Sequence, residues 1–381
     1  MARRILLLIT GLIILTFIYI SGGKSSARSG IAAPLPPVEN TRSIWPPRLQ
    51  DAICRPNIYV YTIPDDIQVS KHIQDTSCFA SNYKSELILY NQLRDPTSKV
   101  HQLFVTNDPQ RADFFYIPFL GACWLTKCWS EHNWNWNERC GVDDVYVRPL
   151  MNYIIRENPY WNRSQGRDHI MVHPMDHTST YYETTRDSFK NAIFLTTVGD
   201  KRSVRAHAHR RYRDIVIPSA TGILHRAMIN PLDYLTQTGS PKPHISRSGR
   251  TIKVLFRGLY QNVPPNDVYS LGIRSLFSTF EKLPGWDLAA SATDDDYAQR
   301  LAKATFGLTP MGWTLDTTRL WEYLAFGVIP VIIADGIIEP FEDDVDWHSF
   351  AVFVRREDAH RLPAILAKYT PDDIARMQHR D

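Results

Sequence analysis

Apolar residues form short continuous runs along the chain, and these alternate with longer segments in which apolar residues recur every three to four positions. The short runs are rich in Val, Ile, Phe and Tyr, which is typical of strands buried on both faces of a sheet. The longer segments have the period of an amphipathic helix. This alternation predicts an α/β fold, in which helices cover mostly parallel sheets.

The pattern divides the chain into two similar halves. In the first half it predicts strands at 58–61, 112–119, 170–172, 193–198 and 215–217, helices near 85–93 and 145–156, and a short element at 102–106. In the second half it predicts strands at 251–256, 286–289, 305–309 and 328–333, and helices near 268–282, 294–303 and 316–326. The stretch 219–249 is rich in Pro, Gly and Ser, which is typical of a junction.

We therefore expect two Rossmann-like, doubly wound domains, at 51–235 and 236–381, that face each other across a cleft. Ligands of such sheets bind beyond the carboxyl ends of the strands.

The first fifty residues indicate in which cellular compartment most of the chain lies. Arg3 and Arg4 precede an apolar run at 5–20, and this combination is typical of a signal peptide or a signal-anchor. We expect an uncleaved transmembrane anchor at 1–23 in type II orientation, with a cleaved signal peptide as the alternative. Residues 24–50 contain five prolines and little periodic apolar pattern, so they are expected to form a stem. The bulk of the chain would then lie in a lumen.

Composition narrows the function classes. Hydrophobic residues make up 44% and charged residues 22% of the 381 residues, so wholesale disorder and a polytopic membrane protein are excluded. The formal net charge is only +3, which argues against nucleic acid as the partner. Aromatic residues make up 12%, which suits contact with sugar rings and equally suits a large core.

The five cysteines, at 54, 78, 123, 128 and 140, predict disulfides in a lumenal protein, with one thiol left over. Cys123, Cys128 and Cys140 lie close together in a tryptophan-rich stretch, where a local disulfide would brace a loop. Zinc binding is the weaker alternative because the chain has no paired CxxC motif.

The segment 306–347 carries the clearest chemical pattern. A predicted strand ends at Pro310-Met311-Gly312, and Asp316 is placed to cap the helix that follows. Arg319 and Glu322 are three positions apart and share a face of that helix. A helix N-terminus beside a glycine loop and an arginine predicts a diphosphate site, while Glu322 could accept hydrogen bonds from ribose hydroxyls. The alternative is that Arg319 and Glu322 form a surface ion pair.

This segment also carries a family resemblance. The sequence R-L-W-E-Y-L-A-F-G-V-I-P-V-I-I at 319–333, followed by P-F-E-D-D-V-D-W at 340–347, closely resembles the nucleotide-sugar-binding segment of the exostosin family, glycosyltransferase family 47. Three further stretches, at 108–119 (D-P-Q-R-A-D-F-F-Y-I-P-F), 158–172 (N-P-Y-W-N-R-S-Q-G-R-D-H-I-M-V) and 214–219 (D-I-V-I-P-S), are similar to family motifs in the family's order.

The resemblance implies the glycosyltransferase B fold and an inverting transfer from a UDP-sugar to a glycan or polysaccharide acceptor. It also implies a single-pass type II protein of the Golgi membrane with a lumenal catalytic domain, without a cofactor or metal beyond the donor substrate. Complexes with other glycosyltransferases are a further expectation. By position, Arg257, Arg319 and Glu322 match basic and acidic positions of the family's nucleotide site, and Gly312 lies in its loop. The motif at 158–172 and the residues just after it would face the cleft.

The sequence departs from the family at two places. Many members have cysteines just before the glycine loop, where this chain has F-G-L-T-P-M-G, and the chain ends at Asp381, soon after its last predicted helix. We therefore do not expect the second transferase domain of the animal heparan-polymerising members. The single-domain plant or algal wall-polysaccharide type is therefore the closer analogy.

The implied mechanism needs a base in the first domain. Asp176 is the first candidate and His169 the second, because both flank the strand predicted at 170–172. Arg257, Arg319 and the helix N-terminus after Gly312 would stabilise the charge that develops on the diphosphate.

Two other functions stay open. A metal-dependent transferase could use Asp344-Val345-Asp346 or the spacing of His173 and His177, and chelators would abolish its activity. A non-catalytic, transferase-like subunit of a polysaccharide synthase complex would bind or hydrolyse no donor.

Overall fold

A computed structural model describes residues 55–67, 78, 83–202, 209–220, 229, 231, 234, 250–261, 269–291 and 294–378. The predicted anchor at 1–23, the stem at 24–50, Cys54 and most of the junction around residue 235 lie outside these residues. Among the residues that are described, no helix has the length and apolar character needed to cross a membrane.

The first unit is built on a parallel sheet of five strands. Its order is β1-β2-β3-β4-β6, and every neighbouring pair runs in parallel. The strands are β1 (Ile58–Val60), β2 (Phe114–Tyr116), β3 (His169–His173), β4 (Ile193–Thr196) and β6 (Ile215–Val216). All residues of β2 and β3 are buried, as expected for strands covered on both faces.

The second unit has its own five-stranded parallel sheet, in the order β12-β10-β9-β7-β8. Its strands are β7 (Ile252–Arg257), β8 (Trp286–Ala289), β9 (Ala304–Pro310), β10 (Ile329–Ile333) and β12 (Val352–Phe353). From β7 the chain goes first to β8 on one side and then to β9 on the other. The strand order therefore reverses between β7 and β9, and ligands bind at such a switch point.

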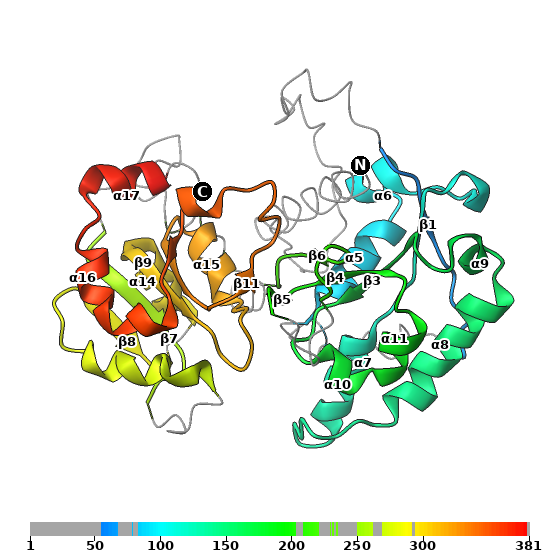
Figure 1. Ribbon diagram of the computed structural model, residues 1–381, viewed down its shortest axis with the longest axis horizontal. Coiled ribbons are helices and arrows are strands. Elements are labelled where there is room, and N and C mark those ends of the chain that lie inside the picture. Colours follow the sequence, from blue (N-terminus) through cyan, green and yellow to red (C-terminus); the bar gives the residue numbers. More distant parts are fainter. Residues whose placement is uncertain are drawn as a thin grey trace, which may run out of the picture.

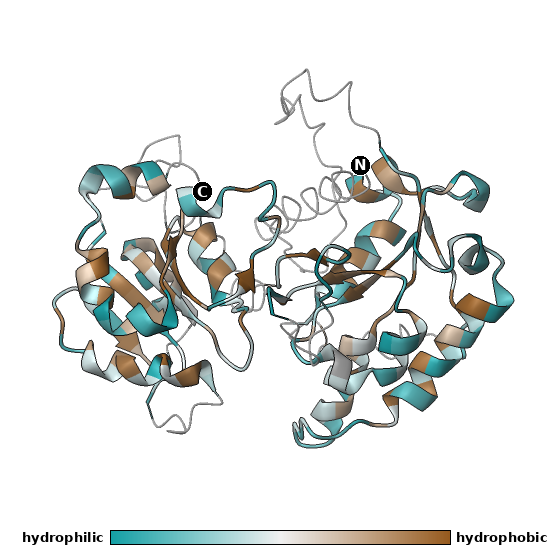
Figure 2. Cartoon of the chain, in the orientation of Figure 1, coloured by the Kyte–Doolittle hydropathy of each residue, from teal (hydrophilic) through white to brown (hydrophobic). Residues whose placement is uncertain are grey.

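Helices surround both sheets (Figure 1), and many of the strands consist mainly of hydrophobic residues (Figure 2). The first unit contains α5 (Ser85–Arg94), α6 (Lys99–Phe104), α7 (Gly121–Glu131), α8 (Arg148–Asn152), α9 (Tyr160–Ser164), α10 (Thr178–Tyr181) and α11 (Glu183–Ser188). The second contains α14 (Asp294–Lys303), α15 (Arg319–Ala325), α16 (Leu362–Leu366) and α17 (Pro371–Gln378). Ile229 and Tyr234 pack with the second unit.

One predicted helix does not form as expected. The stretch predicted as a helix at 268–282 contains only two short 3₁₀ segments, Ser270–Gly272 and Arg274–Thr279, among its described residues. Ser270 and Leu271 have φ values of 61° and 49°, which interrupt a right-handed helix. The backbone N–H of Ser270 instead donates to the Gly312 carbonyl at 2.9 Å, so a tertiary contact determines this conformation.

A short antiparallel ladder joins the two units (Figure 1). It pairs β5 (Gly199–Asp200) of the first unit with β11 (Ile337–Ile338) of the second. The Lys201 N–H extends the ladder by donating to the Gly336 carbonyl at 2.7 Å. The carboxyl edge of the first sheet therefore lies against the second unit.

Candidate functional site

The candidate site lies where β7 and β9 end, at the switch point of the second sheet. β7 is followed by Gly258, and β9 leads into Met311 and Gly312. The backbone at Gly258 has a φ of 152°, and a Cβ built there would lie 2.6 Å from Nη2 of Arg319. Only glycine leaves room for the arginine at this turn.

Arg319, the first residue of α15, reaches back to the end of β7. Its Nε donates to the Arg257 carbonyl at 2.9 Å, and its guanidinium lies 4.7 Å from the centre of the Phe256 ring. A backbone carbonyl and an aromatic face orient the guanidinium but do not neutralise it.

Arg274 is a second guanidinium at the same edge. It is 5% exposed, its Nε donates to the Met311 carbonyl at 3.0 Å, and its Nη1 donates to the Tyr269 hydroxyl at 2.6 Å. Burial and the neighbouring charge of Arg319 lower its pKa to about 10. A Cβ built on Gly312 would lie 3.4 Å from Nη2 of Arg274, which places the glycine loop beside this charge.

These two cations lie close together without a neutralising group. Among the described residues, neither Arg274 nor Arg319 forms an ion pair with a carboxylate. Holding two like charges together in a partly buried place costs free energy unless an anion binds between them. The arrangement is suited to a diphosphate, and Arg274 is a site residue that the sequence analysis did not single out.

Arg257 has a different position from the one expected. Its side chain is 8% exposed, and its Nη2 donates to Oδ1 of Asp287 at 2.7 Å. Its Nη1 donates to the Asp287 carbonyl at 2.8 Å, so the guanidinium lies over β8. Asp287 also accepts from Arg300. The side chain that was expected to face the diphosphate is thus occupied in an ion-pair network, while the carbonyl of the same residue orients Arg319.

Glu322 lies on α15 and is 5% exposed, with its Oε2 accepting from the Tyr297 hydroxyl at 2.9 Å. This burial contradicts the alternative of a surface ion pair between Arg319 and Glu322.

The first unit contributes Asp176, which follows the carboxyl end of β3. Its Oδ1 accepts from the Tyr83 hydroxyl at 3.1 Å. Burial, followed by the charge of Asp176, raises the pKa of Tyr83 above its usual value, and Asp316 of the second unit adds to this rise. Two carboxylates from different units therefore meet at the junction beside one tyrosine.

Asp316 does not cap the helix as predicted. The helix α15 begins only at Arg319, with Thr318 as its N-cap residue, so the expected helix N-terminus directly after Gly312 is absent. Asp316 instead lies near the Ser219 side chain and the Thr317 backbone, which both favour its charged form. Burial, with a contribution from the charge of Asp176, raises its pKa to about 7.

Replacing Asp316 with Asn is expected to change how stability depends on pH. Between the pKa of an unfolded Asp, about 4, and the raised value, the folded state holds a proton that the unfolded state releases. This carboxyl group therefore lowers the free energy of unfolding as the pH rises through that range. Thermal unfolding of the full chain should show a midpoint that falls more steeply between about pH 4 and about pH 7 in the wild type than in Asp316→Asn. Asp344→Asn, at an exposed position, is the matched control and should follow the wild type; equal slopes for all three proteins would contradict the raised pKa.

His169 is not at this junction. It is the first residue of β3 and is fully buried, with Nε2 2.9 Å from the Tyr61 hydroxyl and Nδ1 2.8 Å from Oδ1 of Asp168. It lies at the amino end of the strand, whereas ligand sites of parallel sheets lie at the carboxyl end. The second candidate for the base is therefore wrong in its placement, and Asp176 remains.

The structure also argues against the two metal sites that the sequence left open. His173 is 1% exposed and packs its ring against Phe194 at 4.4 Å, and burial lowers its pKa to about 3. Asp344 and Asp346 lie in an exposed turn that follows Pro340 instead of a buried strand. Neither arrangement gathers three ligands in the part of the chain that the structure describes.

Comparison with known proteins shows which family the chain belongs to. The family model described as the Exostosin GT47 domain matches residues 54–369. The chain belongs to the exostosin GT47 family.

Relatives of this GT47 chain have transferase names. A rice protein (Oryza sativa subsp. japonica) called "Probable glucuronosyltransferase GUT1" is 29% identical over 340 residues, which is 86% of this chain and 74% of that protein. The Arabidopsis thaliana protein "Probable beta-1,4-xylosyltransferase IRX10" is 28% identical over 341 residues, 86% of this chain and 75% of that protein. The predicted family and the prediction of glycosyltransferase activity are thereby confirmed. The two parallel sheets fit the glycosyltransferase B type of fold.

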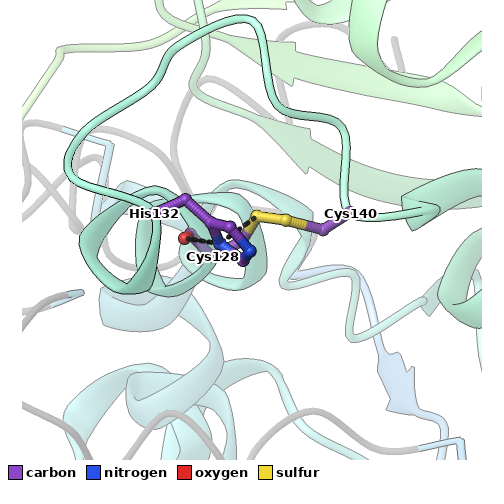
Figure 3. Close-up of side chains that lie close together, drawn as sticks. All are labelled: Cys128, His132 and Cys140. Atoms are coloured by element: carbon purple, nitrogen blue, oxygen red, sulfur yellow. Dashed lines mark hydrogen bonds between the residues drawn. A yellow bond between two sulfur atoms is a disulfide. The ribbon is translucent and has the colours of Figure 1, made fainter.

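Four cysteines of the GT47 domain form two disulfides, Cys78–Cys123 and Cys128–Cys140. The second closes a loop after α7, as the clustering of cysteines predicted. His132 lies beside it, with Nδ1 2.8 Å from the Cys128 carbonyl (Figure 3). Because both sulfurs are bonded to each other, they are not available as thiolate ligands for zinc.

Proposed function

We propose that this glycosyltransferase inverts the anomeric centre while it transfers a sugar from a UDP-sugar to a polysaccharide or glycan acceptor. The observation that carries the proposal is the pair of guanidiniums, Arg274 and Arg319, at the switch point of the second sheet. No carboxylate of the described residues neutralises either group, and a diphosphate matches two adjacent cations in charge. The carboxylate of Asp176 faces this unit from the first unit.

In the proposed reaction, Asp176 accepts the proton of the acceptor hydroxyl. The acceptor oxygen then forms a bond to the anomeric carbon, while the bond from that carbon to the diphosphate breaks on the opposite face. The electron pair leaves with UDP, and Arg274 and Arg319 stabilise the negative charge that develops there. The Tyr83 hydroxyl, which donates to Oδ1 of Asp176, orients the carboxylate.

Other residues hold the donor in this proposal. Glu322 would accept hydrogen bonds from the ribose hydroxyls, with its carboxylate oriented by Tyr297. Trp313, which follows the glycine loop and is 59% exposed, presents an aromatic face beside Tyr269 at a ring distance of 5.2 Å. The names of the relatives make UDP-glucuronic acid and UDP-xylose the first donors to test, and plant-type wall polysaccharides the first acceptors.

A panel of UDP-sugars tests this function. The full chain, solubilised in detergent, is incubated with each donor, with and without a chelator, and release of UDP is measured. Hydrolysis or transfer with one donor that persists in the chelator supports the proposal. Loss of activity with chelator would favour a metal-dependent transferase, while a folded protein that binds and hydrolyses no donor would favour the non-catalytic subunit.

The anchor leads to a separate prediction about topology. We propose a Golgi location, with residues 1–23 anchoring the chain and the transferase domain in the lumen. A glycosylation acceptor tag inserted after Gly30 should be modified, and the protein should stay in the membrane fraction after a carbonate wash. The same tag placed before Arg3 is the control and should stay unmodified. Secretion of the whole protein into the medium would contradict the anchor and indicate a cleaved signal peptide.

A further inference from the structure

A loop of the first unit exposes two tryptophan side chains. It connects α7 to the helical segment that starts at Asp143, and it contains Trp134 and Trp136, which are 50% and 52% exposed. The two rings continue a series of tilted aromatic contacts that starts at a buried tryptophan. Trp136 lies 4.8 Å from the buried Trp129, and Trp134 lies 5.8 Å from Trp136. Large aromatic residues are usually buried, so an exposed pair of this kind needs an explanation.

The loop is held firmly in this conformation. The Cys128–Cys140 disulfide closes it (Figure 3). Nε1 of Trp129 donates to the Glu138 carbonyl at 3.0 Å. The backbone N–H of Trp134 donates to the Trp129 carbonyl at 2.7 Å. Asn133 and Trp134 have φ values of 53° and 58°, and residues other than glycine keep this conformation only when their surroundings fix it. The exposed rings are therefore presented by a preorganised loop.

The tryptophans adjoin the candidate base through Tyr181. The Tyr181 hydroxyl donates to the Trp136 carbonyl at 3.1 Å, and the guanidinium of Arg139 lies 4.1 Å from the Tyr181 ring centre. Tyr181 ends α10, which begins two positions after Asp176. The charge of Asp176 contributes to the raised pKa of Tyr181, after the larger effect of burial, so the two groups are close in space.

We propose that Trp134, Trp136 and Tyr181 form an acceptor platform, a surface on which pyranose rings of the acceptor glycan stack while one chain end reaches Asp176. The inference rests on the proposed function and extends it to the acceptor. Flat aromatic faces match the apolar C–H faces of sugar rings, and rigid rings lose little conformational entropy on binding. Arg139 is exposed and adds hydrogen-bond donors for hydroxyl or carboxylate groups of the glycan.

The platform implies that the enzyme recognises several sugar residues of the acceptor and not only the terminal one. Because the tryptophans adjoin Asp176 only through Tyr181, a glycan that contacts both must span several sugar residues. Acceptors of several residues should therefore bind more tightly than a disaccharide. A site made only by groups around Asp176 would not depend on chain length in this way.

Direct glycan binding tests the platform. The probes are xylohexaose, cellohexaose and glucuronoxylan, titrated without donor against the full chain in detergent. In the double variant Trp134→Ala/Trp136→Ala, the affinity for the best-bound probe should fall about 5–20-fold. The Trp→Phe double variant keeps flat rings and should restore most of it. Tyr212→Ala, which removes a 78% exposed ring on the loop before β6, is the control and should bind like the wild type.

Activity measurements distinguish the loss of acceptor binding at the platform from a general loss of folding. In the double alanine variant the KM for a long acceptor should rise, while UDP affinity, donor hydrolysis and the thermal midpoint stay near the wild-type values. The inference is overturned if the wild type binds none of the three glycans, or if the folded double variant binds them unchanged. It is equally overturned if the alanine changes abolish flotation with phosphatidylcholine vesicles but leave glycan binding intact. Glycan binding without any transfer would contradict the proposed function and leave the platform supported.

Discussion

Asp176→Asn is expected to lower the rate of glycosyl transfer about 10²–10⁴-fold, because an amide does not accept the proton of the acceptor hydroxyl. The Asn oxygen still accepts from the Tyr83 hydroxyl, so the local structure should persist. UDP affinity should stay near the wild-type value, since the guanidinium pair belongs to the other unit. Steady-state rates with a saturating donor, together with calorimetric titration of UDP, measure both quantities on the same protein.

A matched control separates catalysis from stability in that experiment. Asp187 on α11 is an exposed aspartate of the same unit, with a side chain 74% exposed, and Asp187→Asn should leave the rate unchanged. If Asp176 only caps the turn before Thr178 and orients His177, Asp176→Asn would lower the thermal midpoint. The rate per folded molecule would then stay within a few-fold of wild type, and the assignment of the base would be wrong.

Arg319→Ala is expected to weaken UDP binding by about 1.5–3 kcal/mol, or roughly 10–150-fold, through the loss of charge-assisted hydrogen bonds. Arg319→Lys keeps the charge but loses the planar fork, so its affinity should lie between those of the wild type and the alanine variant. Calorimetric titration of UDP into each folded variant measures the loss. Arg361→Ala, at a side chain that is 60% exposed, is the control.

An unchanged UDP affinity in folded Arg319→Ala would refute the donor site. Arg274 is less suited to this test, because its side chain donates to the carbonyls of Leu259, Pro310 and Met311. Its removal would leave buried carbonyls without donors and would lower stability together with binding.

Hydrophobic pattern alone predicted much of the fold. The strand at Trp286–Ala289 and the helix at Asp294–Lys303 have the predicted bounds. For the helix, the strongly amphipathic pattern allows one interpretation. The failure at 268–282 has a physical cause. That segment has a helical pattern, but the hydrogen bond from Ser270 to Gly312 and the bonds of Arg274 to distant carbonyls override it.

The site was predictable only in part. Arg319, Glu322 and Gly312 were found from one contiguous motif, and the structure places Arg319 beside Gly258 at the end of β7. Arg274 lies far from that motif in sequence. The only sequence signal that could have identified it was weak, because it is an arginine three positions before Phe277, which is buried. The pairing of Asp316 with Asp176 depends on how the two units meet, which local patterns do not encode.

The ladder between β5 and β11 also restricts the motions that are open to the enzyme. It ties the two units together, so we expect substrates to enter by rotation of the units about this tether or by its rupture. Gly199 makes the tether tight, since a Cβ there would lie 2.5 Å from the Ile338 carbonyl oxygen. The ladder thus works as a pivot. Amide hydrogen exchange at Lys201 and Ile338 would report how often the ladder opens and the two units separate.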